Sequence, residues 1–307
     1  MLRYISGRIT QAIFILFGVS FITFLLLYIL PADPAVQIAG RSATPETVAS
    51  IRAQLGLDQP LFVQYFNYLT NLLQGDFGRS YLQKSEVSTL IMSRLGPTLS
   101  LMICAIAIEL LIGLTLGILA AMNRGKIVDK TLMVISFVAV SAPQFIASIL
   151  ILYIFAVKLG WFPIGGYGDP IHYVLPALTL GLLGSGWYSR VMRSSMLDVL
   201  RQDYIRTARA KGAPTSRIIR VHAFKNAILP IIAMIGLDIG IFMGGIVVVE
   251  SVFGWPGIGQ LAWQAIQRVD IPIIMGVTLV SAIAIVIGNL IADLIAPFVD
   301  PRIKLKN

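Results

Sequence analysis

Long runs of apolar residues dominate the chain. Five runs carry almost no charge and are long enough for a helix to cross the hydrocarbon core of a membrane, which takes about 20 residues. A sixth run is shorter and ends at Arg190, whose long side chain can extend to the membrane surface. Gly and Pro recur inside the runs, and no run alternates as a membrane β-strand does. The six predicted membrane helices cover residues 9–30, 99–122, 132–157, 173–189, 227–249 and 271–292.

The composition excludes an ordinary soluble domain. Of 307 residues, 57% are hydrophobic and 13% are charged, and the mean hydropathy is +0.83. Soluble domains carry about 25% charged residues. The single cysteine, Cys104, lies within an apolar run and has no second cysteine with which to pair. The sequence therefore predicts an all-α membrane protein without disulfides.

Basic residues are distributed unequally between the connections. If both termini are cytoplasmic, the segments on that side hold 17 of the 24 Lys and Arg residues and only four acidic residues. This asymmetry is the one that the positive-inside rule requires. The net charge of +9 is then explained by topology and anionic lipid, without a nucleic-acid partner.

The first long connection, residues 31–98, is expected outside the cytoplasm and predicts two short helices. One begins at Thr44 and Pro45 and ends near Gly56, and the other follows Pro60. The second helix has an apolar face that is expected to pack on the spans or to lie on the membrane surface. That face consists of Leu61, Tyr65, Leu69 and Leu72.

The cytoplasmic connection, residues 190–226, is basic and predicts two helical pieces with a fixed bend. Asp203 is a candidate N-cap of a helix that ends at Ala210, Gly212 and Pro214 interrupt the chain, and Thr215 begins the second piece. Membrane anchoring would explain the charge but not the bend. We therefore expect this segment to dock another protein.

A third connection, VESVFGWPGIGQLAWQAIQRVD at residues 249–270, predicts a tight turn beside an amphipathic stretch. Irregular backbone at membrane depth survives only inside protein or beside a wet cavity. The segment is therefore either an external loop or a gate. Its candidate path or gate residues are Glu250, Trp255 and Pro256.

Two features inside the spans are further candidates. The carboxyl groups of Glu109 and Asp238 lie in apolar runs, where charge is costly, so they either face a translocation path or are paired within the structure. Gly236, Gly240 and Gly244 recur at every fourth position, which allows neighbouring helices to approach closely.

Sequence signatures of catalysis are missing. The chain has no phosphate-binding loop, no nucleophile elbow and no metal-binding cluster of Cys and His, and its two His residues are far apart in sequence. Ser185 has no identifiable catalytic partner. We predict a transport protein that is not an enzyme and binds no metal or cofactor. A proton-coupled secondary carrier that uses Glu109 and Asp238 stays open as an alternative.

Four segments resemble one family. DYIRTARAKGAPTSRIIRVHAFKNAILP, residues 203–230, resembles the EAA loop of ABC importer permeases in the branch that serves dipeptides, oligopeptides, glutathione and nickel. Arg206, Thr207 and Ala208 stand where the general pattern has Glu, Ala and Ala, a departure that looks typical of the peptide branch. The supporting matches are LPADPA near Pro31, QLGLDQPLFVQYFNYLTNLLQGDFGRS from Gln54, and VVVESVFGWPGIGQ from Val247.

The resemblance implies a type I ABC importer (MetI-like) permease fold of six membrane helices in a bacterial inner membrane. The expected organisation is a span with an extracytoplasmic helical insertion at residues 1–97, a transmembrane domain at 98–299 with a coupling loop at 194–226, and a cytoplasmic tail at 300–307. It also implies the residues that dock the ATPase, which are Asp203, Tyr204, Arg206, Thr207, Ala208, Ala210, Lys211, Gly212 and Ile218.

The same resemblance implies partners and cargo. They are a second, homologous permease in a heterodimer, two ATPase subunits that bind ATP and Mg²⁺, an extracytoplasmic substrate-binding protein, and membrane lipid. The expected cargo is a dipeptide, oligopeptide or peptide-like solute, and glutathione, an opine or a nickel chelate is the alternative.

Overall fold

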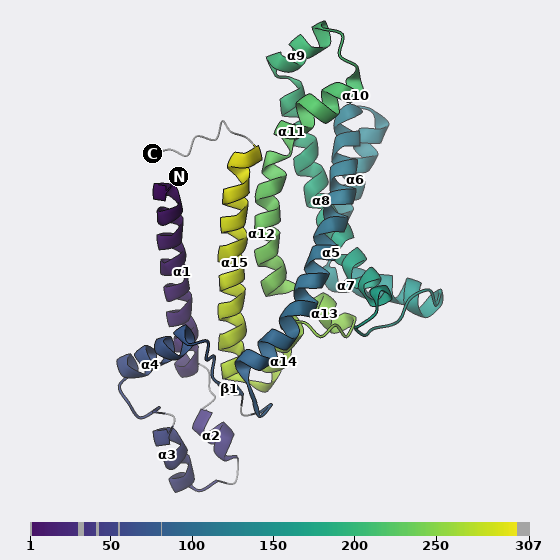
Figure 1. Cartoon of the computed structure of the whole chain (residues 1–307). Helices are drawn as coiled ribbons and strands as arrows, with labels where there is room; N and C mark the ends of the chain where they lie inside the picture. Colours follow the sequence, from purple (N-terminus) through teal and green to yellow (C-terminus); the bar gives the residue numbers. More distant parts are fainter. Residues whose placement is uncertain (1, 30–33, 41–42, 55, 81, 300–307) are drawn as a thin grey trace. The chain divides into compact units, whose positions relative to one another are not determined.

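The computed structural model describes residues 2–29, 34–40, 43–54, 56–80 and 82–299, and helices form most of it (Figure 1). The motif around Pro31 and the predicted tail at 300–307 lie outside the described residues. The α-helices in the N-terminal half are α1 (Leu2–Ile29), α2 (Pro34–Ala39), α3 (Pro45–Gln54), α4 (Leu61–Leu73), α5 (Val87–Met122), α6 (Ile127–Ser141) and α7 (Gln144–Leu152). Those that follow are α8 (Pro170–Leu200), α9 (Asp203–Ala210), α10 (Thr215–Arg217), α11 (Phe224–Ala227), α12 (Leu229–Gly245), α13 (Val247–Val252), α14 (Ile258–Arg268) and α15 (Ile271–Val299).

Other regular structure is short. Two π-helical segments, η1 (Tyr153–Lys158) and η2 (Ile218–Ala223), continue α7 and α10. Strands β1 (Arg79–Ser80) and β2 (Ser85–Glu86) form an antiparallel hairpin in which Arg79 pairs with Glu86 and Ser80 with Ser85. The sequence did not predict this hairpin, nor the short helix α2, within the 31–98 connection.

The chain folds into two compact units. Residues 1–98 and 256–284 form the first, and residues 99–255 and 285–307 form the second. Helices α5 and α15 each contribute residues to both units.

Among the described residues, three helical stretches are long and apolar enough to cross a membrane: Ser6–Leu25, Val87–Met122 and Ile271–Ile291. Two bent pairs meet the same criterion together, Ile127–Ser141 with Gln144–Lys158 and Thr215–Ala227 with Leu229–Met243. The described residues therefore offer up to five spans. The predicted span at 173–189 lies within the 31-residue helix α8, and the number six stays a prediction.

The prediction of one continuous helix over 132–157 was wrong. Helices α6 and α7 meet at an angle of 100°. Ala142 has an extended conformation with a ψ of 124°, and Pro143 follows it at the start of α7. The proline ring disfavours helical backbone at the residue before it, so the apolar run continues while the helix ends.

A proline also accompanies the break near the start of the predicted span at 227–249. Pro230 lies in the first turn of α12, and the helical stretch before it is bent by 48° relative to α12. A second interruption at Ile246 separates α12 from α13.

In the first unit, α4 packs against α1 through Tyr65. The Tyr65 hydroxyl lies 2.9 Å from the Ser20 hydroxyl, and the rings of Phe17, Phe21 and Phe24 surround the tyrosine ring at centroid distances of 5.2–5.8 Å. The predicted apolar face of this helix is thus divided between packing and exposure, since Leu61 is exposed.

The β-hairpin and α15 are joined by a buried polar contact in the first unit. The Ser80 hydroxyl donates to the Asp270 carboxylate at 2.5 Å, immediately before α15 begins. Farther along α15, Gly276 faces Val87 and Ile91 of α5, and an added Cβ at Gly276 would lie 2.6 Å from the Val87 side chain. The missing side chain allows the two helices to approach closely.

In the second unit, α8 lies between other helices. On one side, the Ser136 and Ser189 hydroxyls lie 2.6 Å apart and join α6 to α8. On another side, Gly117 of α5 faces α8 so closely that an added Cβ would lie 2.6 Å from the Ser189 carbonyl oxygen. The long α8 therefore holds both neighbours in place up to the point where α9 begins.

Candidate functional site

Helix α9 begins directly after α8 and is amphipathic. Gln202 is the N-cap, with extended backbone, and Asp203 is the first helical residue, so the prediction of Asp203 as N-cap was wrong by one position. The helix ends before Gly212, whose φ of +78° favours a glycine because other residues are strained there.

A small apolar core supports α9 from below. Ile205, the buried residue of α9, belongs to a cluster with Met196 of α8 and with Ile218 and Ala223 of η2. This core packs α9 against the end of α8.

A polar contact closes the loop around the same core. The Tyr204 hydroxyl accepts a hydrogen bond from the Asn226 amide at 2.7 Å and lies 3.4 Å from the His222 carbonyl oxygen. The two helical pieces that the sequence predicted on either side of Gly212 are thereby joined, in a segment at one end of α8 and α6 (Figure 1).

Most of the predicted docking residues are exposed. Ala208 is half-buried and Ile218 is 3% exposed, so Ile218 lies beneath the surface that a partner would contact. The exposed members are Asp203, Tyr204, Arg206, Thr207, Ala210, Lys211 and Gly212.

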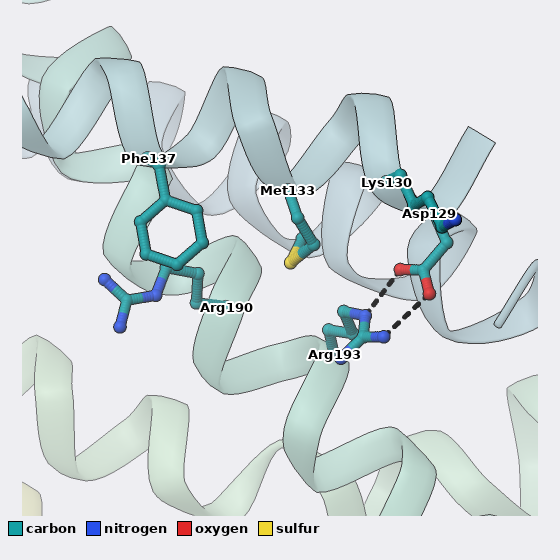
Figure 2. Close-up of a pocket in the computed structure, with 6 residues that line it drawn as sticks. All are labelled: Asp129, Lys130, Met133, Phe137, Arg190 and Arg193. Carbon is teal, nitrogen blue, oxygen red and sulfur yellow. Dashed lines mark hydrogen bonds and ion pairs between the residues drawn. The ribbon is translucent and has the colours of Figure 1, made fainter. Parts of the chain in front are cut away.

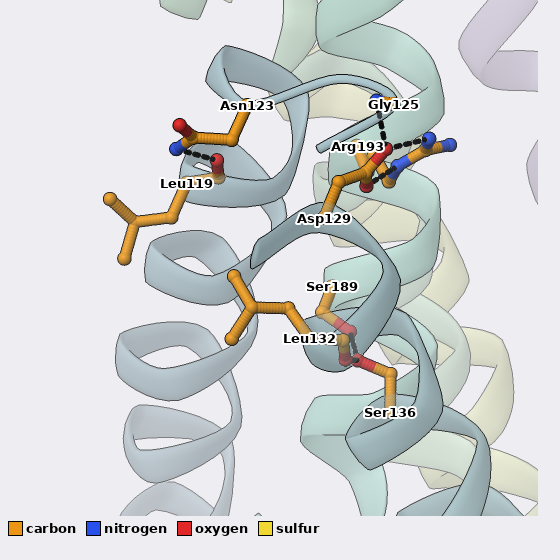
Figure 3. Close-up of polar contacts among 8 residues, drawn as sticks. All are labelled: Leu119, Asn123, Gly125, Asp129, Leu132, Ser136, Ser189 and Arg193. Atoms are coloured by element: carbon orange, nitrogen blue, oxygen red, sulfur yellow. Dashed lines mark hydrogen bonds and ion pairs between the residues drawn. The ribbon is translucent and has the colours of Figure 1, made fainter. Parts of the chain in front are cut away.

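An ion pair that sequence reasoning missed joins α6 to α8 near this loop. Arg193 donates from Nε and Nη2 to both carboxylate oxygens of Asp129, and the Gly125 backbone N–H donates to the same carboxylate at 2.9 Å (Figure 3). Asp129 is buried, whereas the Arg193 side chain is 27% exposed. The sequence shows both charges near span ends, but 64 residues separate them and nothing local pairs them.

The two candidate carboxyl groups meet in the second unit. Asp238 of α12 accepts a hydrogen bond from the buried Tyr188 hydroxyl of α8, and its carboxyl group interacts with that of Glu109 of α5. Glu109 is 2% exposed and lies against Gly184, where the lack of a side chain provides room for its carboxyl group. The three residues link three helices, and Tyr188 was not among the sequence candidates.

The candidate gate segment is largely buried. Trp255 is fully buried in the second unit, with the rings of Tyr167 and Tyr173 edge-on at centroid distances of 4.9 and 4.5 Å. Glu250 is also fully buried, and its carbonyl oxygen accepts from the Trp255 backbone N–H at 2.7 Å. Pro256 is half-buried in the first unit.

The glycines of α12 lie at positions of close helix contact. Gly236 and Gly240 are buried, and an added Cβ at Gly240 would lie 2.8 Å from the Ile285 side chain of α15. From the other helix, an added Cβ at Gly288 would lie 3.0 Å from the Gly236 carbonyl oxygen. The surroundings of Gly244 lie outside the described residues.

The described part of the chain contains no group of three or more His, Cys, Asp or Glu side chains placed to hold a metal ion. The described surface of α9 is basic, helical and largely exposed, and the candidate carboxyl groups of the interior take part in polar contacts between helices.

Two family models match the chain and define its class. The model described as "Binding-protein-dependent transport system inner membrane component" matches residues 113–305, and its N-terminal companion, "Binding-prot-dependent transport system membrane comp, N-term", matches residues 1–102. The chain belongs to this family of inner-membrane permeases and is a permease subunit of an ABC importer.

Curated relatives place it in the branch indicated by its EAA-like loop. The glutathione transport system permease protein GsiC of Salmonella choleraesuis (strain SC-B67) is 40% identical over 306 residues, which cover 100% of both chains. GsiC of Escherichia coli (strain K12) is 39% identical over the same coverage. The expected membership of the dipeptide, oligopeptide and glutathione branch is thus confirmed.

Solved structures confirm the type I importer permease fold. A chain of the inward-facing MetNI methionine ABC transporter matches with a TM-score of 0.59 and 19% identity, over 68% of this chain and 96% of that one. A chain from an amino acid ABC transporter with histidines matches with a TM-score of 0.54 and 18% identity, over 69% and 94% of the two chains. An ABC importer permease of this class works with ATPase and substrate-binding protein partners.

Proposed function

We propose that this permease subunit forms one half of a heterodimeric translocation path for peptides or peptide-like solutes, and that it docks an ATPase subunit through α9 and the loop that follows. Two ATPase subunits would bind ATP and Mg²⁺ and hydrolyse the nucleotide. The permease itself would hold no cofactor. An extracytoplasmic binding protein would deliver the cargo to the path.

The exposed basic surface of α9 carries the docking proposal. Arg206, Arg209 and Lys211 are exposed, while Ile205 turns inward to the core shared with α8. The i,i+3 pair between Arg206 and Asp203, at 3.6 Å with both side chains largely exposed, contributes little to stability, so both groups remain available to a partner. A short amphipathic helix of this kind fits a groove in another protein.

The mechanism follows from the rigidity of this support. Closure of an ATPase dimer would displace α9, and the core around Ile205 would pass that displacement to α8. The Asp129–Arg193 and Ser136–Ser189 contacts would carry α6 along with it. Rigid-body tilting of packed helices is a sufficient basis for alternating access.

Orientation follows from charge. With both termini cytoplasmic, the coupling loop at 194–226 and most Lys and Arg residues face the ATPase side. The extents of the family matches, 1–102 and 113–305, support an N-terminal part at 1–97 that precedes a transmembrane domain at 98–299. We also propose a cytoplasmic tail at 300–307.

The cargo proposal rests on the relatives. The permeases that are 39–40% identical are named for glutathione, which is a tripeptide. A peptide-like solute is therefore the class that we propose, with an opine or a nickel chelate as the alternative. The path or gate roles of Glu109, Asp238, Glu250, Trp255 and Pro256 remain hypotheses.

The rival function is a proton-coupled carrier that uses Glu109 and Asp238. The contact between these carboxyl groups is the observation that favours it. Against it, Glu109 is 2% exposed and Asp238 is engaged by Tyr188, which supports a structural role. Uptake by vesicles that contain only this chain, driven by a proton gradient without ATP, would establish the rival.

The decisive experiment reverses one charge in the docking surface. The tagged chain is expressed in its native membrane with its partner genes, and retained ATPase and ATP-driven uptake are measured for Lys211→Glu. We expect about tenfold less retained ATPase, because the ATPase groove would meet a like charge. Lys158→Glu reverses another exposed lysine, in η1, and serves as the control. Unchanged binding and uptake in Lys211→Glu would overturn the docking proposal.

A further inference from the structure

A surface pocket of about 320 Å³ lies between α6 and α8, and its two other charged residues, Lys130 and Arg190, have no role in the proposed coupling (Figure 2). Figure 2 shows the Asp129–Arg193 pair at one end, the Phe137 ring over Arg190 at the other, and Met133 between them. The pocket is lined by Asp129, Lys130, Met133, Phe137, Arg190 and Arg193.

The pocket carries two positive charges that no ion pair neutralises among the residues that the structure describes. Asp129 is fully engaged by Arg193 and by the Gly125 backbone N–H. Within the described residues, neither Lys130 nor Arg190 takes part in an ion pair. Two cations that line one pocket repel each other, so an anion placed between them is stabilised.

Aromatic rings hold Arg190 in place. Its guanidinium carbon lies 4.6 Å from the centre of the Phe137 ring and 5.1 Å from that of Trp187. Attraction to the ring faces restrains the guanidinium group, and its N–H groups can still donate to a ligand. A planar set of donors suits bidentate binding of a phosphate.

The remaining surface of the pocket is apolar and continues along an exposed face of α6. Met133 and Phe137 lie one turn apart, and Val134, Phe137 and Val138 are 52–64% exposed. A soluble anion would leave this apolar surface uncovered. A ligand with an anionic head and hydrocarbon chains would cover both parts.

The sequence places the same residues at a membrane boundary. Lys130 lies two residues before the apolar run that begins at Leu132, and Arg190 directly follows the run that ends at Ser189. The two cations therefore lie at the level where lipid headgroups meet water, on the side of the membrane that carries α9.

We propose that this pocket binds the phosphate of an anionic phospholipid. Arg190 and Lys130 donate to the phosphate, and the acyl chains lie along Met133 and the exposed face of α6. The Asp129–Arg193 pair forms one wall of the pocket and keeps α6 and α8 at the required distance.

The test measures bound lipid directly. The full-length chain, with the subunits that copurify, is exchanged into nanodiscs of equal phosphatidylglycerol and phosphatidylcholine, and retained lipid is identified by native mass spectrometry after release. We expect a preference for phosphatidylglycerol that the variant Arg190→Gln/Lys130→Gln reduces about tenfold or more, since each cation near a membrane surface favours anionic lipid.

Matched variants separate the pocket from overall charge. Arg124→Gln/Lys126→Gln removes two exposed cations from the adjacent loop, outside the pocket, and is expected to keep the preference within about twofold. If the double pocket variant does not fold, the single change Lys130→Gln at an exposed position is used in its place. We expect it to reduce the preference for phosphatidylglycerol about threefold to fivefold.

Three results would overturn the proposal. They are equal retention of the two lipids by the unmodified chain, equal losses in pocket and loop variants, and removal of the preference by excess inorganic phosphate, which would indicate a soluble ligand. None of these measurements involves cargo, ATP or uptake, so their outcome is independent of the proposed transport function.

Discussion

Arg193 donates to both carboxylate oxygens of Asp129, at 2.6 and 2.7 Å, and so joins the C-terminal part of α8 to the first turn of α6. The Gly125 N–H adds a third hydrogen bond to the same carboxylate. A bidentate pair of this geometry restrains rotation as well as distance, so α6 and α8 are expected to move together.

The first prediction concerns this pair. Asp129→Asn should lower the free energy of unfolding by about 1–3 kcal/mol, because a buried charged acceptor is lost and Arg193 keeps only part of its hydration. Thermal unfolding of the purified chain with its copurifying subunits measures the effect. The double variant Asp129→Asn/Arg193→Gln should be only slightly less stable than Asp129→Asn, since the ion pair is already lost in the single variant. If the stability losses of the two single changes were fully additive, Asp129 and Arg193 would not form a direct pair.

The second prediction concerns the Tyr188–Asp238 contact. Tyr188→Phe should lower the free energy of unfolding by about 1–2 kcal/mol, because the Asp238 carboxyl loses its hydroxyl donor in a poorly hydrated interior. Asp238→Asn retains a carbonyl oxygen that accepts from Tyr188 and should preserve ATP-driven uptake within about twofold. Complete loss of uptake in Asp238→Asn, with normal stability and ATPase binding, would favour the proton-coupled alternative.

The third prediction uses two glycines of α5. At Gly117 an added Cβ would lie 2.6 Å from the Ser189 carbonyl oxygen, which belongs to backbone and cannot rotate away. Gly117→Ala should therefore destabilise the protein by about 1–3 kcal/mol. Gly96 has no atom within 4 Å of the same position, so Gly96→Ala should leave the melting temperature unchanged or slightly raised. Equal effects at the two sites would show that α5 and α8 do not approach so closely.

The fourth prediction concerns the contact of α4 with α1. Tyr65→Phe removes the hydroxyl that lies beside Ser20 and should lower the free energy of unfolding by about 1 kcal/mol. Tyr65→Ala also leaves a cavity among three Phe rings and should lower the free energy of unfolding by about 3–5 kcal/mol. Phe62→Ala, in the same helix but 81% exposed, provides the control and should cost under about 0.5 kcal/mol. Limited proteolysis of the 61–73 segment would report the loosening independently.

The sequence predicted those elements whose causes are local. Thr44 accepts a hydrogen bond from the Thr47 backbone N–H and begins α3, and Pro60 directly precedes α4, because capping and fixed φ values act within a few residues. The EAA-like segment and its glycine, Gly212, could likewise be identified from the sequence, since a family pattern consists of consecutive residues.

The sequence did not show where one helix ends and the next begins within an apolar run. Hydropathy measures whether residues can lie in lipid and says little about backbone direction, so the apolar run over 132–157 hid the bend at Ala142 and Pro143. The proline was visible, but prolines also occur inside continuous helices of this protein, such as Pro97 in α5 and Pro176 in α8. Packing against neighbours decides which proline ends a helix.

By itself, the sequence determined that the chain is a helical membrane protein, which family it resembles and which segment is basic and bent, because composition, charge and motif follow from the order of residues alone. Only the tertiary structure decided that Asp129 meets Arg193, that Tyr188 meets Asp238, and that Ile218 lies beneath α9. The partners are far apart in the sequence. The shortest separation is the 13 residues from Ile205 of α9 to Ile218, and the longest is the 64 residues from Asp129 to Arg193. Their partners are fixed by how helices pack, which depends on many weak contacts at once and leaves no local pattern in the chain.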